Sequence, residues 1–476
     1  QYTRESGVLC PHCTNHCSRT ILHFPDGGCY VTGNRCDRGA VVMEAAPAHK
    51  AQEVPDLFRL RQELLFKTYP VSPVREEQSQ TVGLPRVLEF WDSMPFWSTF
   101  FRALGYRVKF SHPSSRRQYE SGLQYVASDT ICFPAKLVHG HVLDLSKQGV
   151  DRIFLPYILH MPTENKGEKS PYVCPVIMGY SMVVRNFQSP GEHFSVGFET
   201  PVFHWFSKQD RKRQICRYAV EHCGATKRQA EAAYRQAETA ILSFRHQLVE
   251  EGKRVIADTG KAGGFAVVLA GRPYHTDPLI NHDLSGMFTR RGIPVLTVDS
   301  LPGLEKADLR RSRVEITNDF HARMLSGAMV TAEQPCLEYV QIVSFGCGHD
   351  AILSDEIIRL LGEGSGKPPL ILKVDESEAA GSLGIRVQSF IETVQLRRSA
   401  QAEQAACRLP EPYAVKYRKE DRKLRTVLVP NISAPVSTLL TALMDREGIR
   451  AVRLPVGGVE QIRVGKKYTH NDICFP

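Results

Sequence analysis

The chain has no apolar run of the roughly 18 residues that a membrane-spanning helix needs. It also has no N-terminal apolar segment of the kind found in secretory signal peptides. We therefore expect a soluble, cytoplasmic protein with no membrane partner.

The sequence also lacks the glycine-rich Walker motif that binds nucleotide phosphates and the serine-centred elbow of many hydrolases. The triplet Gly346-Cys347-Gly348 is too short for a dinucleotide-binding fingerprint. Residues for hydrolysis or nucleotide-driven chemistry are therefore not visible in this sequence.

Charged residues of one sign do not gather in one part of the sequence, although the net charge is +9. Basic residues are mixed with acidic ones, and aromatic residues do not alternate with lysine or arginine as they do on nucleic-acid-binding strands. Nucleic acid is therefore not an expected partner. The hydrophobic share of 42% is ordinary for a folded protein, and 476 residues suffice for two to four domains.

Cysteine is abundant, with 13 residues, and the number is odd. In a chain without a secretory signal, metal or redox chemistry explains such cysteines better than a disulfide framework does. The question is which of them act together.

The first cluster has the spacing C-x2-C-x3-C-x18-C and comprises Cys10, Cys13, Cys17 and Cys36. A hairpin predicted from strands at 21–24 and 29–32 would return Cys36 to the first three thiols. Four thiolates suit zinc or an iron–sulfur cluster, and free thiols in an N-terminal tail are the alternative. Cys29 lies within a strand, so we expect it not to be a ligand.

A second feature is an internal repeat. The motif SDTICFP at 128–134 recurs as HNDICFP at 470–476, and each copy follows a similar succession of strand, helix and strand. The repeat predicts two copies of one βαβ-like unit, each of which supplies a cysteine, Cys132 or Cys474. Because the second copy stops just after Cys474, we expect the sequence to be part of a longer polypeptide.

Between these features, short apolar strands alternate with amphipathic helices, which predicts an α/β fold with parallel sheets in two Rossmann-like lobes. Strands are expected at 85–90, 107–110, 152–156, 265–270, 294–298, 340–345 and 369–374. Helices are expected at 96–104, 135–147, 176–184, 209–223, 227–252, 285–291 and 351–361. The expected units are a Cys-rich knuckle at 1–44, a helical linker at 45–80, the α/β region at 81–424 and the start of a repeated lobe at 425–476.

Three cysteines of the α/β region each precede a predicted helix. Cys132 and Cys174 are followed by proline within two residues, and Cys347 lies between two glycines. The N–H groups at a helix N-terminus stabilise a thiolate, the form that ligates metal. Three such thiolates at the carboxyl ends of parallel strands can hold a cubane cluster, whereas three unrelated buried cysteines are the alternative.

Other polar candidates are weaker. His275 and His282 follow a predicted strand, and Tyr125 precedes Cys132, so all three are candidates for catalysis beside a cluster. Lys136, His139, His141 and Asp129 are candidates for contacts to the cysteine ligands. Cys216, Cys223, Cys336 and Cys407 have no loop-to-helix setting, and we expect them to be ordinary packing residues.

The motifs together resemble the proteins related to the activators of 2-hydroxyacyl-CoA dehydratases, in the region that follows their ATPase modules. The resemblance extends over nearly the whole chain and lies in CPHC at 10–13, GNRCDRG at 33–39, GLPRV at 83–87, PFW at 95–97, SDTICFPAKLVHGH at 128–141, GRPYHTDP at 271–278, SFGCG at 344–348 and LILKVDE at 370–376.

This part of the family is similar to dehydratase subunits and double-cubane cluster proteins, in which each Rossmann-like half supplies three cysteines to a [4Fe-4S] cluster. The resemblance implies that Cys132, Cys174 and Cys347 are one ligand set and that Cys474 opens a second. It also implies an ATPase activator as partner and a role in anaerobic metabolism. It assigns no role to the N-terminal knuckle.

We therefore predict an iron–sulfur redox protein that takes low-potential electrons from an ATPase activator. The activator is expected to be a module of the same full-length chain. The electrons would serve reductive or dehydration chemistry on an acyl-CoA or another small substrate. The alternative is a non-catalytic electron-relay or activator component that docks with a separate dehydratase. A pocket containing Tyr125, His275 and His282 would favour the first role, and a flat exposed surface the second.

Overall fold

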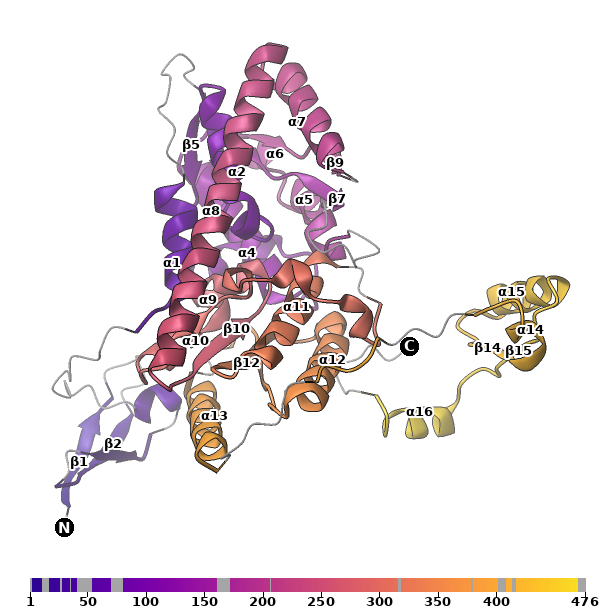
Figure 1. Cartoon of the computed structure of the whole chain (residues 1–476). Coiled ribbons are helices and arrows are strands. Elements are labelled where there is room, and N and C mark those ends of the chain that lie inside the picture. Colours follow the sequence, from indigo (N-terminus) through magenta and orange to yellow (C-terminus); the bar gives the residue numbers. More distant parts are fainter. Residues whose placement is uncertain are drawn as a thin grey trace.

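The structure is a computed structural model that describes residues 2–10, 17–25, 28–34, 36–40, 54–69, 80–160, 172–205, 207–315, 318–377, 380–400, 408–412 and 417–469. It is an α/β protein with parallel sheets, as the sequence predicts. Figure 1 shows the order of its parts, from the N-terminal strands to the C-terminal unit.

The N-terminal part is a three-stranded antiparallel sheet of β1 (Thr3–Leu9), β2 (Ser18–His23) and β3 (Cys29–Thr32), followed by the short 3-10 helix η1 (Asp37–Ala40). The hairpin of β2 and β3 is present where the sequence predicts it. Strand β1 was not predicted, because its sequence TRESGVL has no alternation of apolar and polar residues.

The first lobe is built on a parallel four-stranded sheet with the order β5-β4-β6-β8. Its strands are β4 (Thr81–Leu84), β5 (Arg107–Phe110), β6 (Arg152–Phe154) and β8 (Gly197–Glu199). A second, two-stranded parallel sheet pairs β7 (Tyr157–His160) with β9 (Val202–His204). The sequence does not predict β7, β8 or β9, which are only three or four residues long.

Helices cover this sheet, and aromatic residues fill the space beneath them. The helices of the lobe are α2 (Phe90–Ala103), α3 (Arg116–Gly122), η3 (Leu123–Tyr125), α4 (Phe133–Lys147), α5 (Pro175–Phe187), α6 (Pro190–Phe194), α7 (Lys208–His222) and α8 (Lys227–Lys261). Trp97 of α2 is fully buried, with its ring centroid 4.7 Å from that of Phe154 in β6. No helix of the described residues is long and apolar enough to span a membrane.

The predicted strand at 85–90 is wrong. Strand β4 ends at Leu84, a tight turn with Leu88 at φ 47° follows, and α2 begins at Phe90. Pro85 has no N–H to continue a sheet ladder, and the apolar run after it belongs to a helix that is buried on nearly every side. A helix of that kind has the same continuous apolar sequence as a buried strand.

The second lobe has a parallel sheet in the order β11-β10-β12-β13, so the predicted α/β fold with more than one parallel sheet is confirmed. Its strands are β10 (Ala266–Ala270), β11 (Val295–Leu296), β12 (Leu337–Ser344) and β13 (Leu370–Val374). Its helices are η4 (Pro273–Thr276), α9 (Pro278–Asn281), α10 (Leu284–Thr289), η5 (Val298–Ser300), η6 (Leu304–Lys306), η7 (Leu309–Arg311), α11 (Asp319–Glu333), α12 (Gly348–Ser365) and α13 (Ala380–Ala400). Separate apolar cores lie on the two faces of this sheet.

The segment expected as a linker at 45–80 contains a helix that belongs to the core. Helix α1 (Leu57–Glu63) continues into one turn of π-helix, η2 (Leu64–Thr68), and Leu57, Phe58, Leu64 and Leu65 are buried. Arg61 is 1% exposed and pairs with Asp299 of the second lobe at 2.8 Å. Residues 57–68 therefore do not behave as a linker, because their apolar face packs between the lobes.

The C-terminal unit repeats the beginning of the first lobe. Strands β14 (Val427–Val429) and β15 (Ala451–Arg453) pair in parallel, as β4 and β5 do, and α15 (Ala434–Arg446) joins them. The short helix α14 (Asp421–Leu424) precedes this unit and α16 (Val459–Gly465) follows it. The predicted repeat therefore has the predicted order of elements, whereas Cys474 lies outside the described residues.

Candidate functional site

Each of the three singled-out cysteines caps the N-terminus of a helix. Cys132 precedes α4, Cys174 precedes α5 and Cys347 precedes α12. Proline occupies the first turn of α4 and α5, where its missing N–H costs nothing. The predicted placement of these cysteines at helix N-termini is therefore confirmed.

The three thiols share one electrostatic environment, although Cys132 and Cys174 belong to the first lobe and Cys347 to the second. Burial is the main cause that raises the pKa of Cys132 to about 11, and the charges of Cys174 and Cys347 raise it further. The Arg272 guanidinium and a hydrogen bond from the Ala135 N–H oppose this rise in pKa. The Cys132 thiol is thus protonated at neutral pH and has to lose its proton when it binds a metal.

Arg272 lies at the centre of this environment and is only 3% exposed. It lies two residues after the end of β10, and all three nitrogens of its guanidinium donate hydrogen bonds. Nη1 donates to the Tyr274 hydroxyl at 2.7 Å, and Nε donates to His321 Nε2 at 3.3 Å. Nη2 donates to Cys347 Sγ at 3.0 Å and also to the carboxylate of Asp350. Four acceptors from η4, α11 and the start of α12 therefore meet at one side chain.

A second set of hydrogen bonds fixes the loop that bears Cys347. Asp350 is completely buried, and its Oδ2 accepts the backbone N–H of Ser344 at 2.9 Å. His275 accepts the Arg272 N–H at Nδ1, at 3.1 Å, and donates from Nε2 to Ser344 Oγ at 3.0 Å. The ends of β10 and β12 are joined in this way, so Cys347 is held relative to Arg272.

The thiols are not gathered around a single ion. Within the ranges that the structure describes, no group of three or more His, Cys, Asp or Glu side chains is arranged to hold one metal ion. A polynuclear cluster takes its thiolate ligands at separate metal atoms, so these ligands need not converge on one point as those of zinc do. The donor set is entirely sulfur, which fits an iron–sulfur group.

The edge of the site next to Cys347 faces solvent. Phe345 is 64% exposed, and His349 is exposed as well. Gly346 has φ 74°, in the left-handed region, and a Cβ there would meet no described atom within 4 Å. The site is therefore open beside Cys347, with an aromatic side chain at its edge.

The three candidate catalytic residues lie in separate surroundings. His275 is fully buried, both of its ring nitrogens are engaged, and burial lowers its pKa well below the ordinary value. His282 Nε2 hydrogen-bonds the Asp375 carbonyl at 2.9 Å, and Tyr125 packs near His193 and Phe194. None of these contacts places the three side chains together.

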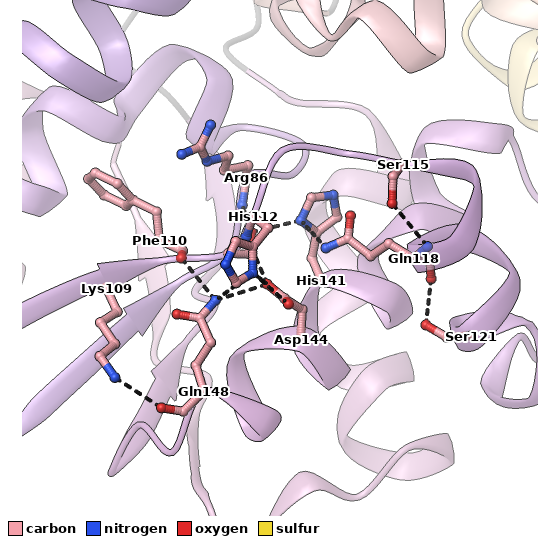
Figure 2. Close-up of polar contacts among 11 residues, drawn as sticks. Arg86, Lys109, Phe110, His112, Ser115, Gln118, Ser121, His141, Asp144 and Gln148 are labelled. Atoms are coloured by element: carbon pink, nitrogen blue, oxygen red, sulfur yellow. Dashed lines mark hydrogen bonds and ion pairs between the residues drawn. The ribbon is translucent and has the colours of Figure 1, made fainter.

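The polar residues of α4 are likewise engaged elsewhere. Lys136 pairs with Glu376 at 2.7 Å, and His139 receives the Tyr180 hydroxyl at 3.2 Å. The charge of Cys132 affects the pKa of Tyr180, so His139 is linked to that thiol only through Tyr180. His141 lies in a different network, in which Figure 2 shows Gln118 directed toward its ring. Asp129 is exposed.

The N-terminal cysteines are described only in part. Cys10 is buried, Cys17 is half-buried and Cys36 is exposed, whereas Cys13 lies outside the described residues. The Cys10 N–H donates to the Cys17 carbonyl at 2.9 Å, which brings the two backbones together at the end of the β1–β2 pair. Cys29 instead faces His23 across β2 and β3, with Sγ 3.2 Å from Nδ1.

The cysteines without a helix-capping position lie within or beside helices of the cores. Cys216 is on α7, Cys223 ends that helix, and Cys336 precedes β12. Cys407 lies outside the described residues.

Four members of the site were not predicted from the sequence: Arg272, Tyr274, Asp350 and Tyr180. A signal was present for two of them, because Arg272 and Tyr274 belong to the motif GRPYHTDP that follows β10. Asp350 lies three residues after Cys347 in the first turn of α12, where a carboxylate is favourable. Their meeting depends on the packing of four elements, which no local pattern specifies.

Comparison with known families gives one match. Residues 81–301, a little under half of the chain, match the family model described as the CoA enzyme activase uncharacterised domain. Over these residues the chain is similar to that family, which agrees with the resemblance to activators of 2-hydroxyacyl-CoA dehydratases. The match includes Cys132 and Cys174 and ends before Cys347. No curated protein matches the chain significantly.

Proposed function

We propose that this chain, whose residues 81–301 match the CoA enzyme activase domain family, is an iron–sulfur redox protein of an acyl-CoA dehydratase or activase system. Cys132, Cys174 and Cys347 would hold a [4Fe-4S] cluster, which supplies one-electron transfer at low potential when bound. Cys474 would open a second ligand set, so that a double-cubane cluster would need further cysteines. Cys10, Cys13, Cys17 and Cys36 would bind zinc or another cluster.

The observation that carries this proposal is the meeting of three helix-capping cysteines in one environment. Each thiol lies at the positive end of a helix, and the charges of Cys174 and Cys347 act on Cys132. Helix N-termini stabilise anions, and a cluster bound by thiolates is an anionic group. Unrelated packing cysteines would have no reason to share this position.

Two features favour the electron-relay role over catalysis at this site. His275 is buried with both ring nitrogens engaged, so it is not free to transfer a proton to a substrate. Phe345, next to Cys347, is 64% exposed at the edge of the site. An open edge with an exposed aromatic residue suits docking of a redox partner. The expected partners are an ATPase activator as electron donor and a dehydratase as acceptor, whereas direct chemistry on an acyl-CoA is the other role.

The experiment is metal analysis of protein purified without oxygen. We expect about four iron and four sulfide per chain, and we expect both to be lost in Cys132→Ala, Cys174→Ala and Cys347→Ala. Matched controls are Cys216→Ala and Cys336→Ala, which remove half-buried cysteines outside the site and should keep the iron. A metal that is lost only in Cys36→Ala would belong to the N-terminal knuckle.

Iron content that is indifferent to all three substitutions would overturn the proposal. A preparation of the unaltered protein that takes up only zinc, even after anaerobic reconstitution with iron and sulfide, would do the same. For the relay role, electron transfer from the reduced protein to a dehydratase should fall in Phe345→Ala while the iron content stays constant. Unchanged transfer in that variant would contradict docking at this edge.

A further inference from the structure

We infer that Arg272 is a positioning residue that raises the reduction potential of the cluster, by donating a hydrogen bond to the sulfur of Cys347 from a buried cation. This inference rests on the proposed function, because it concerns the same cluster. It assigns a role in the control of electron affinity to Arg272 of the GRPYHTDP motif.

The first step is the contact itself. Arg272 Nη2 lies 3.0 Å from Cys347 Sγ, a short distance for a hydrogen bond to sulfur. The same nitrogen also donates to Asp350, which fixes the direction of the guanidinium plane. The contact is therefore built into the fold rather than made by a mobile surface side chain.

The second step is burial. Arg272 is 3% exposed and Asp350 is fully buried, so water does not screen the guanidinium charge from the thiols. The charge of Arg272 acts on Cys132, Cys174 and Cys347, so it reaches all three proposed ligands. Nη1 and Nε donate to the Tyr274 hydroxyl and to His321 Nε2, at 2.7 and 3.3 Å.

The third step is redox chemistry. Reduction adds one electron to the cluster and makes it more negative, and no proton or other group is transferred in this step. Hydrogen bonds to the cluster sulfurs and nearby positive charge stabilise the reduced form, so they raise the potential. Arg272 provides both effects at Cys347. A cluster that receives electrons from a strong reductant would be easier to reduce with Arg272 in place.

Arg272→Lys is the primary test variant, because lysine keeps the positive charge but lacks the planar fork that contacts four acceptors at once. Arg272→Gln removes the charge as well and leaves Asp350 without its partner. The matched control is Arg397→Gln, since Arg397 pairs with the buried Glu338 in the same lobe. Glu338 lies near the start of β12, and about 20 Å of strand separate it from the end that leads to Cys347, at ~3.3 Å per residue.

The measurement is an anaerobic redox titration of the reconstituted full chain, followed by the electron paramagnetic resonance signal of the reduced cluster. Iron and sulfide content and circular dichroism are recorded for every variant. We expect a shift of the midpoint to more negative potential in Arg272→Lys and a larger one in Arg272→Gln. An effect of about tenfold in the ratio of reduced to oxidised cluster corresponds to about 59 mV for one electron. Arg397→Gln should leave the midpoint unchanged.

The outcomes separate the two proposals. If the unaltered protein and all variants fail to take up iron and sulfide, the proposed function is overturned and this inference falls with it. If the unaltered protein binds a cluster and Arg272→Lys has the same midpoint and the same spectrum, only the inference is overturned. If Arg272→Gln does not fold, Arg272→Lys decides the question alone. A midpoint that moves equally in Arg397→Gln would also overturn it, because the effect would then be one of general destabilisation.

Discussion

Ser114 Oγ donates a hydrogen bond to the carboxylate of Asp277, and this bond joins the first lobe to the second. Asp277 caps α9 beside the loop of Arg272, whereas Ser114 lies between β5 and α3. On the other side of Ser114, its hydroxyl meets His141 Nε2 at 3.0 Å. Ser111 Oγ contacts His141 Nδ1 at 2.7 Å and accepts the Arg86 N–H at 2.9 Å. These hydrogen bonds therefore form a continuous chain from the Arg86 N–H, just after β4, to the Asp277 carboxylate.

Asp277 should make stability depend on pH. Burial raises its pKa to about 6, from 3.8 for an ordinary aspartate, although the Ser114 hydroxyl opposes the rise. The folded protein thus holds a proton that the unfolded chain has lost, so this group's contribution to stability falls as pH rises from about 4 to 6 and is constant above. The free energy of unfolding of Asp277→Asn, relative to that of the unaltered protein, should be about 3 kcal/mol higher at pH 8 than at pH 4. Urea unfolding at both pH values measures it.

Ser114→Ala is the companion variant. It removes the hydrogen bond that lowers the pKa of Asp277, so the decline in stability should extend to higher pH than in the unaltered protein. A stability difference between Asp277→Asn and the unaltered protein that is the same at pH 4 and pH 8 would show that the Asp277 carboxyl is not buried as described.

His141 should have the opposite effect at acidic pH. Burial lowers its pKa to about 3, so the folded protein keeps it neutral while the unfolded chain takes up a proton below about 6.5. The stability that this group contributes is therefore lost as pH falls from about 6.5 toward 3. The free energy of unfolding of His141→Asn, relative to that of the unaltered protein, should be about 3 kcal/mol higher at pH 4 than at pH 7. Thermal or urea unfolding at these pH values decides it, and parallel curves would contradict it.

The sequence predicted local features of this site well. A cysteine followed by proline, or placed between glycines, indicates a helix N-terminus, and all three such cysteines cap helices. The strands of the second lobe were predicted to within a few residues, because their apolar runs are long and bounded by glycine or proline. Local patterns were sufficient where the structure depends on neighbours in the chain.

Contacts between residues far apart in the sequence could not be predicted in this way. Ser114 and Asp277 are 163 residues apart, and Arg272 and Cys347 are 75 residues apart. His275 was expected to be available at the edge of the sheet, but packing directed its ring to Ser344 and the Arg272 backbone. The segment 45–80 was expected to be a helical linker because its sequence is polar, but α1 within it buries an apolar face.

Asp92 should be essential for the association of the lobes. It is 2% exposed on α2 and lies close to three arginines: Arg61 at 3.6 Å, Arg245 at 3.3 Å and Arg323 at 2.8 Å. Arg323 belongs to α11 of the second lobe. Asp92→Asn removes a buried negative charge that these three guanidinium groups share, so we expect a loss of about 3–5 kcal/mol.

Urea unfolding at pH 7 measures this loss. These arginines hold the pKa of Asp92 well below its usual range, so the stabilisation is present above about pH 4 and is lost as pH falls further. Glu460→Gln is the control, because its partner Arg463 is an exposed residue of the same helix and no measurable change is expected. An Asp92→Asn protein as stable as the control would mean that the charges are compensated elsewhere.

Two glycines of α8 should respond in opposite ways to substitution by alanine. A Cβ at Gly252 would lie 1.9 Å from the Ser300 carbonyl oxygen, because the helix touches η5 there. A Cβ at Gly260, two turns further along, would meet no described atom within 4 Å. Alanine favours a helix over glycine by about 1 kcal/mol, so Gly260→Ala should stabilise the protein by up to that amount.

Gly252→Ala has the same gain in helix propensity but forces α8 away from the second lobe. We therefore expect its free energy of unfolding to fall by about 1–3 kcal/mol. Unfolding in urea measures both variants under the same conditions. The opposite signs are the decisive result, because propensity alone predicts stabilisation at both positions. If Gly252→Ala were as stable as Gly260→Ala, the close approach of α8 to Ser300 would be absent in solution, and the lobes would be packed less tightly along this helix.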